Sequence, residues 1–504
     1  MQVRSLLILG GGSAGFLSAI TIKSKHPHLP ITVLRSKEIG IIGVGEGTVQ
    51  SLPFHLHGYA GIDIARFYRE AQPTWKLGIW FDWGSRPYFH YTFTHQCDSR
   101  YLKLSKNTGF YYTDRLEDGN LVSSLMAENK VFARQPNGVP LVDHFAYHLE
   151  NELLVQFLET YALEQGIEIV DDKVEEAQQD EHGITGLSLA SGRTLSADLY
   201  LDCSGFRSFL LGKTLEEPFL PFASTLFCDR AIVGGWQRTA EEPIKPYTTA
   251  ETMDSGWCWQ IEHEHHITRG YVHSSAFISE EEAEREMRAK NPRLGPTRVV
   301  RFVTGRYQRA WVKNVIAIGN AGGFVEPLES TSLAVICSDA QAVTEVLRDQ
   351  QGRITSSHRQ GYNLRNERSW NTIRQFLGIH YKFNTRLETP FWQACRADCD
   401  IVGAEPIVAF YRENGPSTLF GSTLVDPADQ FKYDGYLAML VGQNVPHQST
   451  FVPSPAERET WQKIQLANRA KAKQGYTVAE ALAIIRRPDW QWDQNFYKSL
   501  YPVA

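Results

Sequence analysis

The sequence has few cysteines and no long hydrophobic run. Its seven cysteines among 504 residues are scattered and odd in number, so they do not form the framework of a disulfide-rich secreted protein. No stretch approaches the roughly 18 consecutive apolar residues that a membrane-spanning helix needs. The short apolar run at the N-terminus lacks the length and the cleavage site of a signal peptide. We therefore expect a cytoplasmic protein without a membrane partner.

An excess of positive charge is also missing. The formal net charge is −6 at pH 7 and the isoelectric point is about 6.3, which argues against a nucleic-acid surface as the main function. Hydrophobic residues make up 42% of the chain and charged residues 21%, as in an ordinary globular protein with a sizeable core. These values leave an enzyme with a small-molecule substrate as the default. They are compatible with a homodimer.

Glycines are placed where a nucleotide site needs them. The run VRSLLILGGGSAGFLSAITIKSKHP predicts a strand, a glycine turn and a helix that ends before Pro27, and ITVLRS predicts a second strand. Its GxGxxG motif lies between the first strand and the helix, where the glycines form the turn, admit a pyrophosphate and pack the helix on the strand. The expected cofactor contacts here are Gly10, Gly12, Ser13, Ala14 and Gly15.

The second strand ends in Arg35, where an acid that binds the adenosine ribose is expected. An arginine at this position suits a 2′-phosphate, so the glycine motif alone leaves FAD and NADP open. Two later turns of small residues favour FAD. DCSGFRS, residues 202–208, follows one apolar strand, and GNAGGFVEP, residues 319–327, follows another and brings Gly319 and Phe324 to the flavin.

The order of the predicted elements defines the architecture. We expect an α/β protein with a Rossmann-like, flavin monooxygenase-type FAD-binding fold over residues 1–350, with an inserted β-rich segment at about 215–300. Residues 351–504 are expected to form a helical module that covers the substrate. Capping boxes mark helix starts at Ser279 with Glu282 and at Thr477 with Glu480, and Ser454 with Glu457 begins a further helix.

The segment PTWKLGIWFDWG, residues 73–84, places one lysine among aromatic residues. Its alternation predicts a single half-buried strand with Trp75 and Leu77 on the apolar face and Lys76 on the opposite face. On this pattern alone, Lys76 is an ordinary lysine on the solvent side of a strand.

Five motifs together change that interpretation, because the sequence resembles the flavin-dependent halogenases of the tryptophan halogenase family over nearly its whole length. The resemblance lies in GGGSAGFLSA after the first strand, GVGEGT at 43–48, KLGIWFDWG around Lys76, WCWQI at 257–261 and FVEPLESTS at 324–332.

The resemblance implies a role for each matching residue. Lys76 is the family's catalytic lysine, which binds hypohalous acid or carries the halogen as a haloamine, and Glu329 is the matching carboxylate. The backbone N–H groups of Thr331 and Ser332 hold halide, although the family pattern has glycine at the position of Ser332. The remaining matches are assigned to FAD or to the signature motifs: Gly45, Glu46, Trp257, Trp259, Pro327 and Ser330.

The substrate and partners follow from the same resemblance. His90 and Phe93, in PYFHYTF, are candidates for stacking on an arene, with indole or an indole derivative preferred over tryptophan itself. The implied reaction uses reduced FAD, oxygen and bromide or chloride. No second GxGxxG follows a strand, so a separate flavin reductase is the expected source of FADH2.

Three other functions remain open on the sequence. A flavin-dependent aromatic monooxygenase would share the FAD turns without needing Lys76 or the WxWxI motif. A non-catalytic flavoprotein or, because of Arg35, an NADP oxidoreductase would also share the nucleotide turn. The run IEHEHH, residues 261–266, lacks a distant set of His or Cys residues, so we expect no metal site.

Overall fold

The computed structural model describes residues 1–504 except 41–42, 44, 95–103, 114, 136–144 and 493–504. Val44, inside the GVGEGT loop, and the end of the expected C-terminal module therefore lie outside the described residues.

A six-stranded sheet carries the glycine turn, in the strand order β20-β21-β12-β1-β2-β8. Neighbouring strands are parallel except β20, which is antiparallel to β21. Every residue of β1 is buried, as expected for a parallel sheet covered on both faces. The strands are β1 (Leu6–Leu9), β2 (Ile31–Arg35), β8 (Glu168–Asp171), β12 (Leu199–Asp202), β20 (Trp311–Val312) and β21 (Val315–Ala317).

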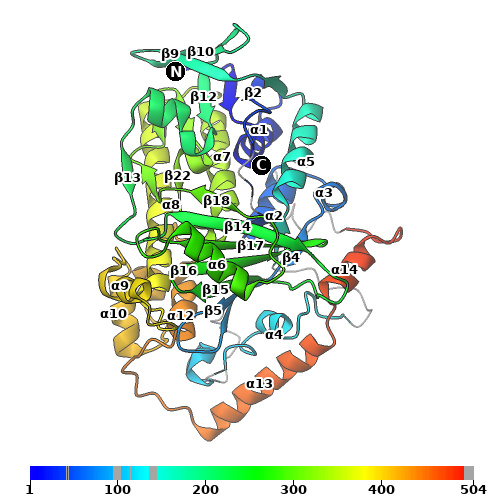
Figure 1. The fold of residues 1–504 in the computed structure, drawn as a ribbon, viewed down its shortest axis with the longest axis vertical. Coiled ribbons are helices and arrows are strands. Elements are labelled where there is room, and N and C mark those ends of the chain that lie inside the picture. The colour runs from blue at the N-terminus through cyan, green and yellow to red at the C-terminus, as the bar shows by residue number, and fades with distance from the viewer. Residues whose placement is uncertain (41–42, 44, 95–103, 114, 136–144, 493–504) are drawn as a thin grey trace.

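Three helices lie against this sheet. The first, α1 (Ser13–Lys25), contacts both α5 (Asn151–Glu164) and α7 (Ser332–Asp349), and Figure 1 shows the three helices gathered beside the strands. The helix α1 ends before Pro27, and β2 follows it. The predicted β-α-β unit and the Rossmann-like α/β class are confirmed.

A second sheet of seven strands lies at the centre of the molecule in Figure 1, in the order β18-β14-β17-β16-β15-β5-β6. The predicted β-rich segment supplies five of its strands and the helix α6 (Glu280–Lys290), whose capping box of Ser279 and Glu282 is present. The strands are β5 (Gly78–Asp82), β6 (Phe89–Thr92), β14 (Arg230–Gln237), β15 (Thr248–Met253), β16 (Gly256–Glu262), β17 (His266–His273) and β18 (Arg298–Arg301).

The segment around Lys76 is not one strand, and this prediction was wrong. Residues 74–76 form β4 (Thr74–Lys76) in a small sheet with β3 (Glu46–Gly47) and β7 (Ala146–Leu149), and the chain joins the seven-stranded sheet only at β5. At the crossing, the Leu77 N–H donates to the Pro246 carbonyl. Residues 73–79 are all buried, whichever way their side chains point, so alternation did not mark a solvent side.

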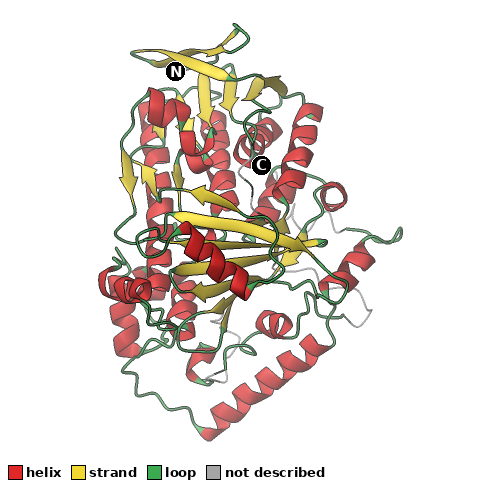
Figure 2. Ribbon diagram, viewed as in Figure 1, coloured by secondary structure: helices red, strands yellow, loops and turns green. Residues whose placement is uncertain are grey.

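Helices dominate the chain after β21, as Figure 2 shows and as the sequence predicts. The helix α12 packs against β6, and α13 packs against α4 (Leu121–Ala127). The predicted capping boxes of α13 and α14 are present. The helices that follow α7 are α8 (Ser356–Lys382), α9 (Pro390–Asp398), α10 (Glu405–Asn414), α11 (Gly421–Leu424), α12 (Lys432–Gly442), α13 (Pro455–Lys473) and α14 (Val478–Ile485).

Smaller elements complete the fold. Among the described residues, no helix is long and apolar enough to cross a membrane. The remaining strands and α-helices are α2 (Ser51–Pro53), α3 (Ile64–Glu70), β9 (Val174–Asp180), β10 (Gly183–Leu189), β11 (Thr194–Leu195), β13 (Phe219–Pro221), β19 (Gly305–Tyr307) and β22 (Gly323–Phe324).

Candidate active site

The glycine turn between β1 and α1 leaves the N-terminus of the helix open. Gly10 has φ +127°, and a Cβ there would lie 2.2 Å from the Cys203 carbonyl oxygen, so a larger residue does not fit. A Cβ on Gly15 would lie 1.9 Å from the Gly10 carbonyl oxygen, because the helix packs tightly on the strand. Apart from its chain neighbours, no described residue lies within 4 Å of a Cβ on Gly12, where a pyrophosphate can approach the backbone.

A cavity of about 770 Å³ opens in front of this turn. Its size suits a dinucleotide, and its wall combines a helix N-terminus with small residues from three strand ends. FAD therefore fits the residues present. The lining includes the predicted contacts Gly10, Gly12, Ser13, Ala14, Arg35 and Glu46, together with Asn151, Glu159, Cys203, Phe206, Asn320 and Ser332.

Arg35 is already paired. Its guanidinium donates a hydrogen bond to Glu159 on α5 and lies 3.9 Å from the Asp171 carboxylate. Arg35 and Glu159 both line the cavity. Glu159 thus brings to this wall the carboxylate that the end of β2 lacks, and the charge of Arg35 is balanced without a 2′-phosphate.

The two-residue strand β3 connects the cofactor cavity to Lys76. Glu46 lines the cavity, and burial raises its pKa to about 7. A Cβ on the next residue, Gly47, would lie 3.4 Å from Lys76 Nζ and 2.8 Å from Ser330 Oγ. Gly45, with φ +82°, makes the turn before β3.

Lys76 is fully buried, so it is not a lysine on the solvent side of a strand. Its Nζ donates a 2.8 Å hydrogen bond to Ser330 Oγ and lies 5.7 Å from the centre of the Phe93 ring. Burial lowers the pKa of Lys76 to about 7, against the opposing negative charge of Glu329. Near neutral pH this amine therefore exists in both its protonated and its neutral form.

Glu329 is buried beside a histidine that the sequence did not single out. Its Oε1 lies 2.6 Å from Nε2 of His380, on α8. His380 Nδ1 lies 2.8 Å from the Phe376 carbonyl oxygen. The left-handed backbone of Ser330, at φ +57°, turns the chain between Glu329 and the start of α7.

A small cavity of about 20 Å³ lies where this turn meets α7. It has room for one water-sized particle, and Thr331 and Ser332 line it together with Gly319, Phe324, Glu326 and Pro327. Ser332 begins α7 and its φ is not positive, so the backbone there does not need the glycine of the family pattern. Ser332 also lines the cofactor cavity, so the small cavity adjoins it.

The signature tryptophans lie in the core beneath this turn. Trp257 and Trp259 project from the same face of β16, with ring centres 6.0 Å apart, and share a hydrophobic cluster with Val325 and Leu328. Burial raises the pKa of the neighbouring Glu326 to about 7, although hydrogen bonds to its carboxyl, including one from Tyr381, act in the opposite direction.

The two predicted stacking residues point in different directions: His90 is in β6, and Phe93 directly follows this strand. Phe93 faces Lys76, whereas His90 packs against Trp80, with ring centres 4.7 Å apart. Tyr91 lies two residues before Phe93. Burial raises the pKa of its hydroxyl, and the negative charge of Glu329 raises this pKa further. Tyr91 also reaches α12, because a Cβ on Gly435 would meet its hydroxyl at 2.7 Å.

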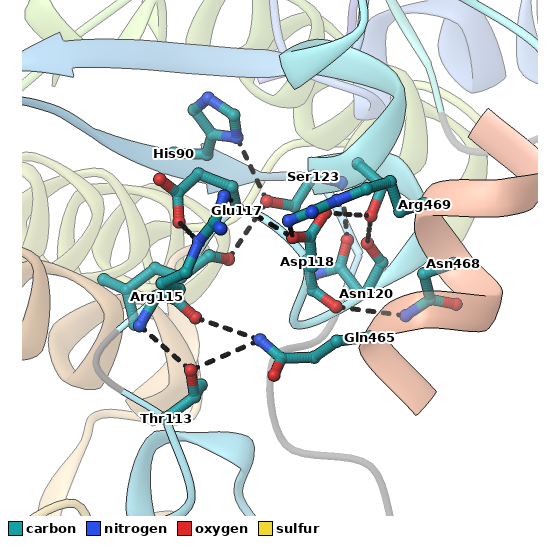
Figure 3. A network of polar contacts seen from close by, with 12 residues as sticks. His90, Thr113, Arg115, Glu117, Asp118, Asn120, Ser123, Gln465, Asn468 and Arg469 are labelled. Carbon is teal, nitrogen blue, oxygen red and sulfur yellow. Dashed lines mark hydrogen bonds and ion pairs between the residues drawn. The ribbon is translucent and has the colours of Figure 1, made fainter. Parts of the chain in front are cut away.

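His90 belongs to a polar network that ties β6 to the C-terminal helix α13 (Figure 3). Its Nδ1 lies 3.0 Å from Ser123 Oγ on α4, and Ser123 donates to the Leu116 carbonyl. The buried Asp118 carboxylate next to α4 accepts from Ser124 and pairs with Arg469 on α13. The network fixes the edge of the seven-stranded sheet against α13.

The structure therefore brings together most of the predicted site. Lys76, Glu329, Ser330 and Phe93 form its centre, and six of the ten predicted cofactor residues line the adjacent cavity. The other four do not line it: Gly319 and Phe324 line the small cavity instead, and Gly15 and Gly45 line neither. Sequence reasoning missed His380, Tyr91 and Gly47; alternation along β6 marks Tyr91, but no local pattern marks His380. No cluster of metal-binding side chains occurs among the described residues.

A Rossmann-like nucleotide domain joined to a buried lysine and carboxylate is an arrangement that suits a nucleotide-dependent enzyme. The family model for tryptophan halogenases matches residues 5–454. Tryptophan 7-halogenase KtzQ from Kutzneria sp. (strain 744) is 33% identical over 446 residues, which are 83% of each chain. The chain therefore belongs to the tryptophan halogenase family and is an enzyme.

Solved structures agree with this family. The crystal structure of MibH, a lanthipeptide tryptophan 5-halogenase, superposes with a TM-score of 0.88 at 36% identity, covering 96% of this chain and 93% of MibH. BrvH, a flavin-dependent halogenase from Brevundimonas sp. BAL3, gives a TM-score of 0.85 at 26% identity over 96% and 100% of the two chains.

Proposed function

We propose that this protein uses FADH2, oxygen and bromide or chloride to halogenate an electron-rich arene, with indole or an indole derivative as the preferred substrate. The observation that carries the proposal is Lys76, a fully buried lysine with a pKa near 7 that interacts with the negative charge of Glu329. Its Nζ binds Ser330, and Ser332, two residues further on, lines the cofactor cavity. The net reaction is arene–H + X⁻ + O₂ + FADH2 + H⁺ → arene–X + FAD + 2 H₂O.

FAD, held by the glycine turn, Ser13 and the 319–324 segment, supplies the oxidising chemistry that converts halide to hypohalous acid. Thr331 and Ser332 offer backbone N–H groups at the start of α7, where partial positive charge favours an anion. The small cavity at this point, lined by Pro327 and Phe324, supports it as the halide position.

Lys76 then binds the oxidised halogen and presents it to the arene. In its protonated form the amine donates a hydrogen bond to hypohalous acid, and in its neutral form it takes the halogen as a haloamine. A pKa near 7 makes both forms available. Ser330 holds Nζ in place by accepting its hydrogen bond. Gly47, which has no side chain, leaves room for this contact.

The arene is expected between Lys76 and Glu329, beside Tyr91 of β6 and Phe93, which follows this strand. Attack on the halogen gives a ring cation, which the Glu329 carboxylate stabilises; the carboxylate then accepts the ring proton. Trp257 and Trp259 shape the core under the turn and keep the Lys76 site dry. His90 supports the same strand from its opposite face.

We infer that a separate reductase supplies FADH2, since the sequence contains no second strand–GxGxxG–helix unit for a nicotinamide nucleotide. The rival function is an FAD-dependent aromatic monooxygenase. It would need neither a dry lysine nor a halide cavity.

The test is a mass spectrum of products from the purified protein with FAD, a generic flavin reductase, NADH and bromide. Indole, free tryptophan and a short tryptophan-containing peptide form the substrate panel, because the relatives' names include both free tryptophan and a lanthipeptide. A bromine isotope doublet on any of them supports the halogenase. A product heavier by one oxygen, formed equally without bromide, would mean that the protein acts as a monooxygenase.

A further inference from the structure

Glu329 and His380 form a buried pair in which both nitrogens of the imidazole have a partner. Both side chains are buried, and Nε2 and Oε1 are 2.6 Å apart. On the other side of the imidazole, Nδ1 is 2.8 Å from the Phe376 carbonyl oxygen. Both ring nitrogens therefore have fixed partners.

These partners determine the number of protons. A backbone carbonyl only accepts hydrogen bonds, so Nδ1 must carry a proton. A contact of 2.6 Å between Nε2 and a carboxyl oxygen requires a further proton between the two atoms. The pair is then either an imidazolium beside a carboxylate or a neutral imidazole beside a carboxylic acid.

The surroundings favour the charged pair. The ring centres of Phe376 and Phe81 lie 4.9 and 5.4 Å from the centre of the imidazole ring. Aromatic rings at this distance can stabilise a cation. Among the described residues, Lys76 and Tyr91 also interact electrostatically with Glu329, and a positive Lys76 stabilises the carboxylate.

We propose that His380 is held as an imidazolium that keeps Glu329 ionised and fixes Oε1, so that Oε2 is the oxygen that serves the reaction. His380 is a positioning residue, since it acts through Glu329. The inference rests on the proposed function for the role of Glu329 but not for the protonation of the pair. When the ring cation collapses, the C–H electron pair returns to the arene and the proton moves to Glu329 Oε2.

The protonation state can be measured without any turnover. In protein labelled with ¹⁵N-histidine, the His380 signals, assigned by their loss in His380→Gln, are expected to show a proton on both ring nitrogens at pH 7. In Glu329→Gln the same ring is expected to become neutral, with a proton on Nδ1 only. An unprotonated Nε2 in the wild-type protein would overturn the proposal.

A kinetic isotope effect tests the positioning role. With ring-deuterated indole as the probe, loss of the ring proton is fast in the wild-type protein, so the isotope effect should be near 1. In His380→Gln, Glu329 keeps a hydrogen-bond donor but loses its cation. We expect kcat to fall about 10-fold with KM changed less than 2-fold, and an isotope effect above about 2 to appear.

The matched control is His57→Gln. His57 is also buried, with Nδ1 2.8 Å from the Ile62 carbonyl oxygen and Nε2 3.0 Å from the Tyr147 hydroxyl, and neither of these partners is Glu329. The His57→Gln variant should have a lower melting temperature than the wild type and an isotope effect near 1. A slow His380→Gln without an isotope effect would contradict the positioning role. Absence of product from every variant, the wild type included, counts against the proposed function, and the ¹⁵N spectrum still decides the charged pair.

Discussion

Lys76 combines complete burial with a pKa near 7, and this combination links its chemistry to stability. In the unfolded chain a lysine titrates at about 10.4. Between pH 7 and 10 the unfolded state therefore holds a proton that the folded state has released, so the free energy of unfolding of the wild-type protein should rise with pH across this range.

Lys76→Met should remove this dependence. At pH 7 we expect the variant to unfold with a free energy about 1–3 kcal/mol higher than that of the wild type, and the difference should shrink as the pH approaches 10. Denaturant unfolding at several pH values measures it. Lys463→Met, at an exposed lysine of α13, should keep the wild-type rise with pH because Lys76 is still present, so its difference from the wild type should not change with pH. An equal difference at pH 7 and pH 10 would argue against a lowered Lys76 pKa.

Gly47 provides a second test at the scale of a residue. A methyl group there would lie 2.8 Å from Ser330 Oγ, the acceptor of the Lys76 hydrogen bond, so Gly47→Ala should displace this acceptor and lower kcat by about 10-fold, the cost of a disturbed hydrogen bond to a charged group. FAD affinity, measured by flavin fluorescence, should change little. Gly361→Ala, where a Cβ has no neighbour within 4 Å, should leave both quantities unchanged. Unchanged kcat in Gly47→Ala would mean that the position of Nζ is not critical.

At the scale of elements, helix ends follow the sequence closely and strand boundaries do not. The capping boxes at Ser279, Ser454 and Thr477 involve residues three apart, so a local pattern contains them fully. The break at Leu77 depends instead on the Pro246 carbonyl, which is distant in sequence. Alternation could not separate β4 from β5 because both faces of the segment are covered.

An ion pair between Asp118, before α4, and Arg469 is one of the contacts that hold the helix α13. Asp118 is buried, and in Asp118→Asn its pairing with Arg469 is lost (Figure 3). We expect a loss of about 1–3 kcal/mol of stability and earlier protease cleavage around α13. Glu459→Gln, which breaks an exposed pair with Lys463 on the same helix, should cost less than about 0.5 kcal/mol. Equal effects in both variants would mean that Asp118 does not anchor the helix.

At the scale of the whole molecule, the nucleotide domain and the β-rich segment meet at the turn of residues 324–332, and this junction contains the site. The sequence places Lys76, Glu329 and the glycine turn, because each belongs to a recognisable motif. It does not place their partners. His380 lies 51 residues from Glu329 and Glu159 lies 124 residues from Arg35, so only the folded chain brings them together.

The pairing of Arg35 with Glu159 predicts which nucleotide binds. Since the guanidinium is already neutralised, 2′-AMP should bind no more tightly than AMP in a titration followed by calorimetry. In Glu159→Gln the freed arginine should favour 2′-AMP by about 10-fold. Glu168→Gln, on the exposed edge strand β8, should cause no change. A preference for 2′-AMP in the wild-type protein would instead favour the hypothesis that the protein is an NADP oxidoreductase.

The most direct measurement compares wild-type protein and Lys76→Ala in a single turnover with pre-reduced FAD, oxygen, bromide and indole, followed by mass spectrometry of the products. Both proteins should oxidise the flavin, since Lys76 lies outside the lining of the cofactor cavity. Only the wild type should give brominated indole, with the variant reduced at least 100-fold. Equal bromination by Lys76→Ala would contradict the catalytic role of the buried lysine.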